Sequence, residues 1–188
     1  MTTVLLVIDM QQDFFKHARL TLRRPALVRS TNEIVTVARE VGVPVVWVKT
    51  EYASDLSDGS LEIRKGQIRI TIAGTRGAEL LPELNALSSE YVILKKRYSA
   101  FFGTDLDRLL ARHNCSQVII AGINTHACVR TTVVDAYQRD FEILLARDCI
   151  DSYDEEHDRI TWRYMDGKLG NGLTNEQLIY KLRQLQTA

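Results

Sequence analysis

Short apolar runs alternate along the chain with longer segments of helical spacing. The run at residues 4–8 shows no alternation of apolar and polar positions, which is typical of a parallel strand covered on both faces. Four further runs are similarly apolar and lie at residues 43–48, 91–94, 118–121 and 141–146. The pattern therefore predicts five strands, of which the first two are buried.

The segments between these runs repeat their apolar residues at helical spacing. Pro25 opens the first such stripe, and Gly42 follows it at a C-cap position. The predicted N-terminal residues of the later helices share a side-chain oxygen that can cap a helix: Thr104, Thr125, Ser152 and Thr174. Alternating strands and helices predict an α/β, doubly wound fold with helices on both faces of a parallel sheet. Without a linker or internal repeat, residues 1–188 form one predicted domain.

Residues 51–74 interrupt this alternation with a polar stretch that contains three glycines. Ile68, Ile70 and Ile72 alternate with Arg69 and Thr71, which predicts a half-buried strand. We expect this stretch to be an excursion from the sheet that lies near the functional site.

The charge balance excludes several classes of function. Twenty-four Lys and Arg residues match twenty-four Asp and Glu residues among 188, and the pI is about 6.9, so nucleic acid is not an expected partner. The first apolar run is too short for a signal peptide or a membrane span, so we expect a cytoplasmic protein without a membrane partner. The charge clusters at residues 19–24 and 154–158 are interpreted as solvated faces.

Three residues that can take part in acid–base or nucleophilic chemistry follow three of the predicted strands. Asp9 comes after the first strand, Lys95 after the third, and Cys128 in the first turn of the helix after the fourth. Ligands of open parallel sheets bind at the carboxyl ends of the strands, so these residues converge there. A helix N-terminus and a nearby ammonium lower a thiol pKa, and a carboxylate can accept its proton. We therefore expect Cys128 to be alkylated at unusually low pH.

Each of these residues also has a structural interpretation. Asp9 can cap a turn, Lys95 can be a solvated strand end, and Cys128 can be a small buried hydrophobe. Cys115 and Cys149 lack such partners and are interpreted as structural. His126 would lie about 200° from Cys128 around a helix, so we do not expect it to act as the general base for this thiol. The four histidines do not have the spacing of a metal site, and the chain has no phosphate-binding glycine motif.

Three stretches of the chain together resemble the isochorismatase-like cysteine hydrolases, which include nicotinamidase and N-carbamoylsarcosine amidase. These stretches are IDMQQDF at residues 8–14, KKRYSAFFGT at 95–104 and AGINTHACV at 121–129. The resemblance implies a Rossmann-like, six-stranded, mostly parallel sheet, a homo-oligomer (dimer or tetramer) and a catalytic triad of Asp9, Lys95 and Cys128. It also implies a cis peptide at Ile123–Asn124, with the backbone N–H groups of Asn124 and Cys128 forming an oxyanion hole.

The resemblance further implies a cofactor-free enzyme that hydrolyses the C–N bond of a small amide or carbamoyl compound through a thioester. Residues 46–52 lack the Asp-x-His pair of the zinc-binding nicotinamidases, so no metal site is expected. Residues 95–101 are also close to the version in true isochorismatases, which cleave a vinyl ether with water and have Gly where this chain has Cys128. A catalytically silent binding protein on this fold is a third reading. The candidate substrate-pocket residues are aromatic: Phe14, Trp47, Tyr52, Tyr98 and Phe102.

Overall fold

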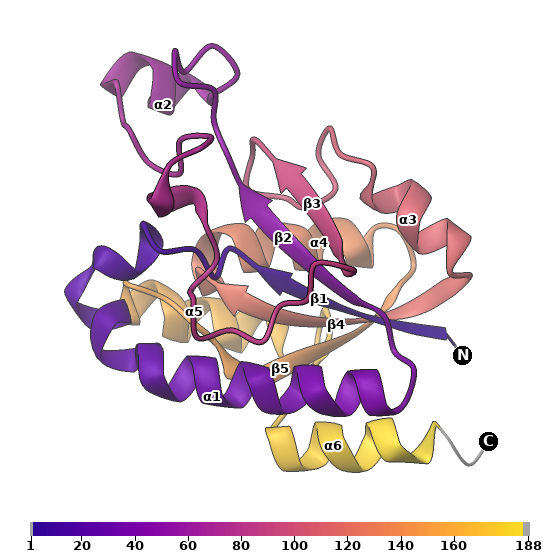
Figure 1. Ribbon diagram of the computed structural model, residues 1–188. Coiled ribbons are helices and arrows are strands. Elements are labelled where there is room, and N and C mark those ends of the chain that lie inside the picture. Colours follow the sequence, from indigo (N-terminus) through magenta and orange to yellow (C-terminus); the bar gives the residue numbers. More distant parts are fainter. Residues whose placement is uncertain (1, 186–188) are drawn as a thin grey trace.

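Six parallel strands form one sheet within residues 2–185, the part of the chain that the computed structural model describes (Figure 1). They are β1 (Thr2–Ile8), β2 (Val45–Thr50), β3 (Tyr91–Lys95), β4 (Cys115–Ile123), β5 (Glu142–Asp151) and β6 (Asn171–Leu173). Their spatial order is β3-β2-β1-β4-β5-β6, so the winding reverses between β1 and β4. The α/β, doubly wound prediction is confirmed. The apolar pattern did not reveal β6, because this strand is only the tripeptide Asn-Gly-Leu.

Helices cover both faces of the sheet (Figure 1). The helices α1 (Ala18–Glu40) and α6 (Asn175–Gln184) cover one face, and α3 (Leu106–Arg112), α4 (Arg130–Tyr137) and α5 (Glu155–Met165) cover the other. Alternate residues of β1 divide between the two cores: Leu5 and Val7 belong to the α1 side, and Leu6 and Ile8 to the opposite side. Burial on both faces explains why β1 shows no polar alternation. The apolar edge strand β3 differs, because its Tyr91, Val92 and Leu94 are exposed.

Two helices begin at residues other than those predicted from the sequence. Helix α1 begins at Ala18, and Pro25 lies inside it on the exposed side, where water can reach the carbonyl group that the missing proline N–H leaves without a donor. Helix α3 has Asp105 at its N-cap, although the Thr104 hydroxyl accepts a hydrogen bond from a backbone N–H of the first turn. The predicted end of α1 is confirmed, since Gly42 follows with φ 75°.

The two predicted capping boxes have different outcomes. Thr174 and Gln177 form the reciprocal pair of hydrogen bonds at the start of α6, as predicted. The prediction for Ser152 is wrong, because Asp154 caps α5 by accepting from the His157 N–H. The Ser152 hydroxyl instead bonds to the ring of His126.

The excursion, residues 51–74, forms no strand, so the predicted half-buried strand is wrong. Thr71 has a positive φ of 47°, which turns the chain, and Tyr52 and Ile72 form only an isolated bridge. The short helix α2 (Leu61–Gly66) lies here, capped by Ser60. The excursion has its own apolar cluster, which comprises Tyr52, Leu56, Ile63 and Ile72, with Ile70 packed against it.

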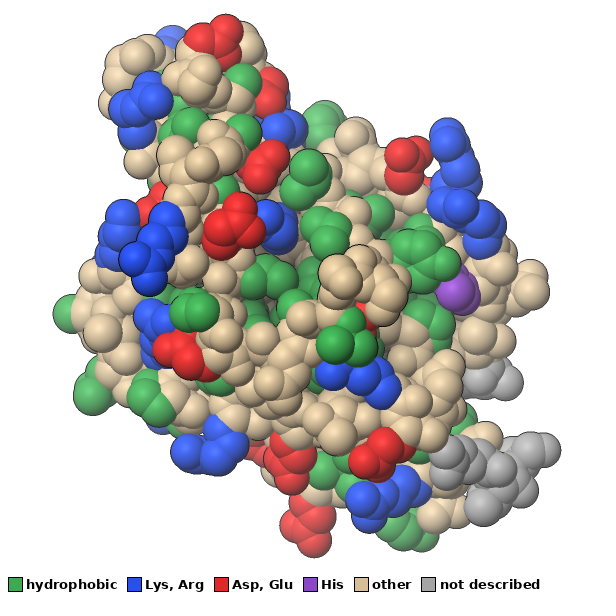
Figure 2. Space-filling model, in the orientation of Figure 1, with side chains coloured by type: hydrophobic (Ala, Val, Ile, Leu, Met, Phe, Trp, Pro, Cys, Tyr) green, Lys and Arg blue, Asp and Glu red, His purple; other side chains and the backbone are tan. Residues whose placement is uncertain are grey.

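The basic cluster at residues 19–24 is partly a structural element, which corrects the solvated-face prediction. Arg19 and Arg23 both contact the carboxylate of the buried Asp151 at the end of β5, at 2.9 and 2.7 Å. Figure 2 shows charged side chains of both signs interspersed over the visible face. Among the described residues, no helix is long and apolar enough to cross a membrane.

Candidate active site

The sheet brings Asp9, Lys95 and Cys128 together, as strand-end reasoning predicted. Asp9 directly follows β1, Lys95 is the last residue of β3, and Cys128 lies in a π-helical turn, η3 (Thr125–Val129), after β4. This turn precedes α4 and has Asn124 rather than Thr125 at its N-cap, so the capping prediction for Thr125 is wrong. The three side chains meet beside the point where the winding of the sheet reverses.

Lys95 lies between the other two side chains. Its Nζ is 2.8 Å from Asp9 Oδ2 and donates to Cys128 Sγ at 3.3 Å. Asp9 and Lys95 are each 1% exposed, and Cys128 is 7% exposed. A buried carboxylate and a buried ammonium are stable only when they are paired, so this contact fixes both charges in place.

Thr50 completes the cluster, and sequence reasoning missed it. Its hydroxyl accepts from Lys95 Nζ at 2.6 Å and donates to Asp9 Oδ1 at 2.9 Å, while Lys95 Nζ also donates to the Arg97 carbonyl at 3.1 Å. Thr50 ends β2 and pairs in register with Lys95. A polar residue at the end of β2 was the available signal, but its partners depend on the register between strands.

Gln11 holds the end of β2 in place. Its side-chain amide donates to the carbonyl groups of Thr50 and Ala78 at 2.8 and 2.7 Å, and its Oε1 accepts from the Thr50 N–H at 2.8 Å. Gln11 has no exposed surface. The fully satisfied amide therefore fixes the position from which the Thr50 hydroxyl reaches Asp9.

Thr50→Val tests the hydroxyl bridge. The substitution keeps the side-chain shape but leaves Asp9 and Lys95 one partner short, so we expect a loss of about 1–3 kcal/mol in the free energy of unfolding. Urea unfolding measures this loss. Thr36→Val is the control, because the Thr36 hydroxyl is exposed and bonds only within α1. Equal effects of the two substitutions would contradict the bridge.

The electrostatics of the cluster correct the expectation for the cysteine. Burial, reinforced by the negative charge of Asp9, raises the pKa of Cys128 to about 12, and Lys95 only partly opposes this. Burial alone would lower the pKa of Lys95, but Asp9 and Cys128 raise it above its ordinary value. The resting pair is therefore a neutral thiol and an ammonium, which is the opposite of the lowered thiol pKa expected from the sequence. If the Cys128 thiol lost its proton to solvent, the thiolate and the Asp9 carboxylate would both depend on the single positive charge of Lys95.

The turn that carries Cys128 approaches β1 closely. The Ile123–Asn124 peptide bond is cis, and Gly122 has φ 116°. A Cβ at Gly122 would lie 2.0 Å from the Ile8 carbonyl oxygen, so only glycine fits between the two strand ends. This approach sets Cys128 beside Asp9. Asn124 and Cys128 both line a cavity above the cluster.

This cavity, which we call the inner cavity, has a volume of about 390 Å³. Lys95 and Cys128 lie in its wall, and the excursion contributes Ile68 and Ile70. The excursion thus lies at the site, as expected. Three of the predicted pocket residues line the inner cavity: Phe14, Tyr52 and Tyr98.

The other two aromatic candidates lie elsewhere. The prediction for Trp47 is wrong, because its ring is buried in the core beside α1 and its Nε1 donates to Glu90 at 2.7 Å. Phe102 is 64% exposed and lines a second hollow next to the inner cavity.

The remaining cysteines and His126 have other partners. Cys149 is buried and donates to Asn175 at 3.3 Å, and Cys115 contacts the Gln117 carbonyl. His126 bonds to Ser152 at 2.6 Å, and burial lowers its pKa. Within residues 2–185, no group of three or more His, Cys, Asp or Glu side chains is placed to hold a metal ion.

Comparison with known proteins identifies the relatives of this chain. A maleamate amidohydrolase of Pseudomonas putida is 29% identical over 96% of this chain and 87% of its own length. A probable inactive nicotinamidase of Arabidopsis thaliana is 36% identical over 74% of each chain. The crystal structure of an isochorismatase family protein from Desulfovibrio vulgaris superimposes with a TM-score of 0.86, at 27% identity, over 97% of this chain and 98% of that one.

Fold and site together define an α/β protein with a buried Asp-Lys-Cys cluster at the carboxyl ends of its strands. The family model described as "Isochorismatase domain" matches residues 3–177. The chain therefore belongs to the isochorismatase family, whose members are hydrolases.

Proposed function

We propose that this chain is a cysteine hydrolase that cleaves the C–N bond of a small amide or carbamoyl compound. The observation that carries the proposal is the cluster itself: one ammonium lies 2.8 Å from a carboxylate and 3.3 Å from a thiol, at the wall of a cavity. A nucleophile, a base and a cation in this geometry are the groups that acyl transfer needs.

In the first half of the proposed reaction, Asp9 accepts the thiol proton while Cys128 Sγ attacks the carbonyl carbon. The negative charge that develops on the carbonyl oxygen is stabilised by the backbone N–H groups of Asn124 and Cys128. The C–N bond then breaks, and the leaving nitrogen takes the proton from Asp9. Ammonia or an amine departs and leaves a thioester on Cys128.

In the second half, water replaces the amine. Asp9 accepts a proton from this water as its oxygen attacks the thioester carbon, and the C–S bond breaks. The proton passes to Cys128, and a carboxylic acid, or a carbamic acid from a carbamoyl substrate, is released. Lys95 keeps its positive charge throughout, because its role is to stabilise whichever of Asp9 and Cys128 is anionic.

The high thiol pKa supports this order of events. Since Cys128 is protonated at rest, its proton must be removed as it attacks, and Asp9 is the carboxylate placed to accept it. A thiolate formed in this way leaves Asp9 neutral, so Lys95 again faces one anion.

A vinyl-ether hydrolase is the alternative that residues 95–101 favour, since this stretch resembles true isochorismatases. In that reaction Asp9 would act on the substrate and water would attack directly, without a bond to Cys128. The relative described as inactive raises a second alternative, a binding protein without turnover.

Trapping of the acyl-enzyme tests the proposal. Primary amides, ureas and carbamoyl acids are first screened for ammonia release, and the slowest substrate is mixed with the protein. We expect intact-protein mass spectrometry to show an added mass equal to the acyl part, which hydroxylamine removes and which maps to Cys128. Ammonia release without any adduct on the acid-quenched protein would contradict the covalent scheme.

A further inference from the structure

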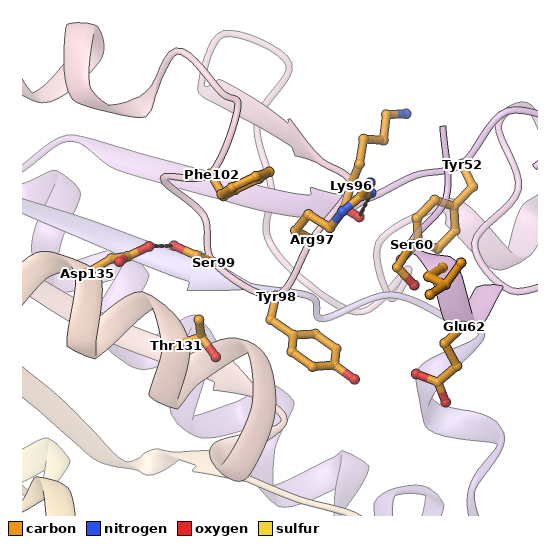
Figure 3. Close-up of a pocket in the computed structure, with 11 residues that line it drawn as sticks. Tyr52, Ser60, Glu62, Lys96, Arg97, Tyr98, Ser99, Phe102, Thr131 and Asp135 are labelled. Carbon is orange, nitrogen blue, oxygen red and sulfur yellow. Dashed lines mark hydrogen bonds between the residues drawn. The ribbon is translucent and has the colours of Figure 1, made fainter. Parts of the chain in front are cut away.

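A second hollow shares part of its wall with the inner cavity. Figure 3 shows the residues that line this second hollow. This hollow, which we call the outer groove, has a volume of about 570 Å³. Four side chains line both spaces: Tyr52, Glu62, Arg97 and Tyr98. The groove and the inner cavity therefore adjoin each other at these four residues.

The charged and polar groups of the groove are mostly bound within the protein. Lys96 pairs with Asp58 at 2.9 Å and also donates to a backbone carbonyl. Asp135 accepts a hydrogen bond from Ser99, drawn in Figure 3, and the Thr131 hydroxyl donates to the carbonyl one turn earlier in its helix at 2.8 Å. These groups have little left to offer a polar ligand.

Most of the free surface of the groove is apolar. Leu61 of α2 is 58% exposed, and Tyr98 and Phe102 of the segment after β3 are 57% and 64% exposed. In Figure 3, Tyr98 and Phe102 project into the space that α2 and α4 border. Apolar side chains from separate segments that face one open hollow gain free energy when a ligand covers them.

We infer that the outer groove binds an apolar arm of the substrate, whose scissile group lies beside Cys128 in the inner cavity. The inference rests on the proposed function and deepens it: the substrate is an elongated amide with an alkyl or arylalkyl arm. An amide of a few heavy atoms would leave most of the two spaces filled with water. Continuity with the cavity that holds Cys128 is what assigns the groove to the substrate.

The wall shared by both spaces carries one charge of each sign. Glu62 has neither a hydrogen bond nor an ion pair within the described residues 2–185, and Arg97 donates only to the backbone carbonyl groups of Asp58 and Lys96. These opposite charges balance, so the groove distinguishes substrates by the apolar surface of the arm rather than by its charge.

Covalent labelling of Cys128 tests the groove without requiring turnover. N-methyl and N-(4-phenylbutyl) chloroacetamide react with the thiol by the same step, in which the S–C bond forms, chloride leaves and the thiol proton passes to Asp9 or to buffer. Labelling rates come from intact-protein mass spectrometry at sub-saturating reagent, with the site confirmed by peptide mapping. We expect the phenylbutyl reagent to react about tenfold faster or more, because its ring is removed from water.

Two variants test whether the faster labelling by the phenylbutyl reagent depends on the groove. Phe102→Ala and Leu61→Ala should each reduce the phenylbutyl rate several-fold and leave the methyl rate unchanged. Tyr180→Ala is the matched control, since Tyr180 is a 70% exposed aromatic residue on α6, outside the groove. Equal rates for the two reagents, or a gain that survives both groove variants, would overturn the inference. So would a groove variant that changes only the oligomeric state in size-exclusion chromatography, because the groove would then be an interface between copies.

Hydrolysis of primary amides with the same arms separates this inference from the proposed function. Arm-dependent labelling without hydrolysis of any amide would support the groove and refute the proposed function. Hydrolysis of short and long amides at equal kcat/KM, together with arm-independent labelling, would refute the groove and support the proposed function.

Discussion

Cys128→Ala is expected to reduce amide turnover by about 10⁴-fold or more, the scale of loss when an enzyme loses its attacking group. Neither Asp9 nor Lys95 can replace the thiol, since the first is the base and the second carries a positive charge throughout. Ammonia release measures turnover, and the thioester adduct should disappear with it. The cavity left by one sulfur atom is small, so unfolding by urea should confirm that the variant is folded.

Cys115→Ala is the control for this experiment. Cys115 is half-buried at the start of β4, where it packs against the core and donates to the Gln117 carbonyl; it lines neither cavity of the site, so its loss should leave turnover unchanged. Substantial turnover by Cys128→Ala on the true substrate would refute the nucleophile assignment. Direct attack by water, as in a vinyl-ether hydrolase, would then be the better account.

Asp9→Asn is expected to slow turnover by about 10²–10⁴-fold, as for a lost general base, and at the same time to lower the pKa of Cys128. The direction follows from the charges: the Asp9 anion raises the thiol pKa, so its removal favours the thiolate. If the variant has a lower thiol pKa and also a lower activity, Asp9 acts as a base and not only through its negative charge. The pH dependence of iodoacetamide alkylation at Cys128 measures the thiol pKa.

Lys95→Met is expected to shift the pKa of the Cys128 thiol in the opposite direction. Without the ammonium, the alkylation profile of Cys128 should move to higher pH, because Lys95 lowers the thiol pKa. The variant also leaves Asp9 buried without a cation, which costs about 3–5 kcal/mol of folding stability. Identical profiles for wild type, Asp9→Asn and Lys95→Met would mean that the three side chains do not titrate as one cluster.

The strand ends were predictable because buried parallel strands have an unmistakable composition. Asp9 and Lys95 follow uninterrupted apolar runs, and parallel strands bring such ends to one edge whatever their register. Thr50 could not be assigned in this way, since its contact with Lys95 depends on how β2 and β3 align. Gln11 likewise binds segments 39 and 67 residues away.

The aromatic residues show that residue type alone does not predict which side chains line a pocket. Trp47 and Phe102 are equally able to line a pocket, yet one is in the middle of a strand and the other in a loop after a strand. A strand covered on both faces gives no alternation from which to assign a side, so the direction of Trp47 could not be derived. The thiol pKa was misjudged for a related reason: helix-end reasoning ignores how completely the sheet edge buries Cys128.

The separate apolar cluster of the excursion has a consequence for how specificity can diversify on this scaffold. The groups assigned to the chemistry are anchored in the strand ends, whereas α2 and its flanking loops supply much of the wall that a substrate meets. Because these loops pack on their own cluster, side chains of residues 51–74 can change without repacking the two cores of the sheet. Part of the wall that meets the substrate is thus separate from the groups assigned to the chemistry, and selection can alter the first while it preserves the second.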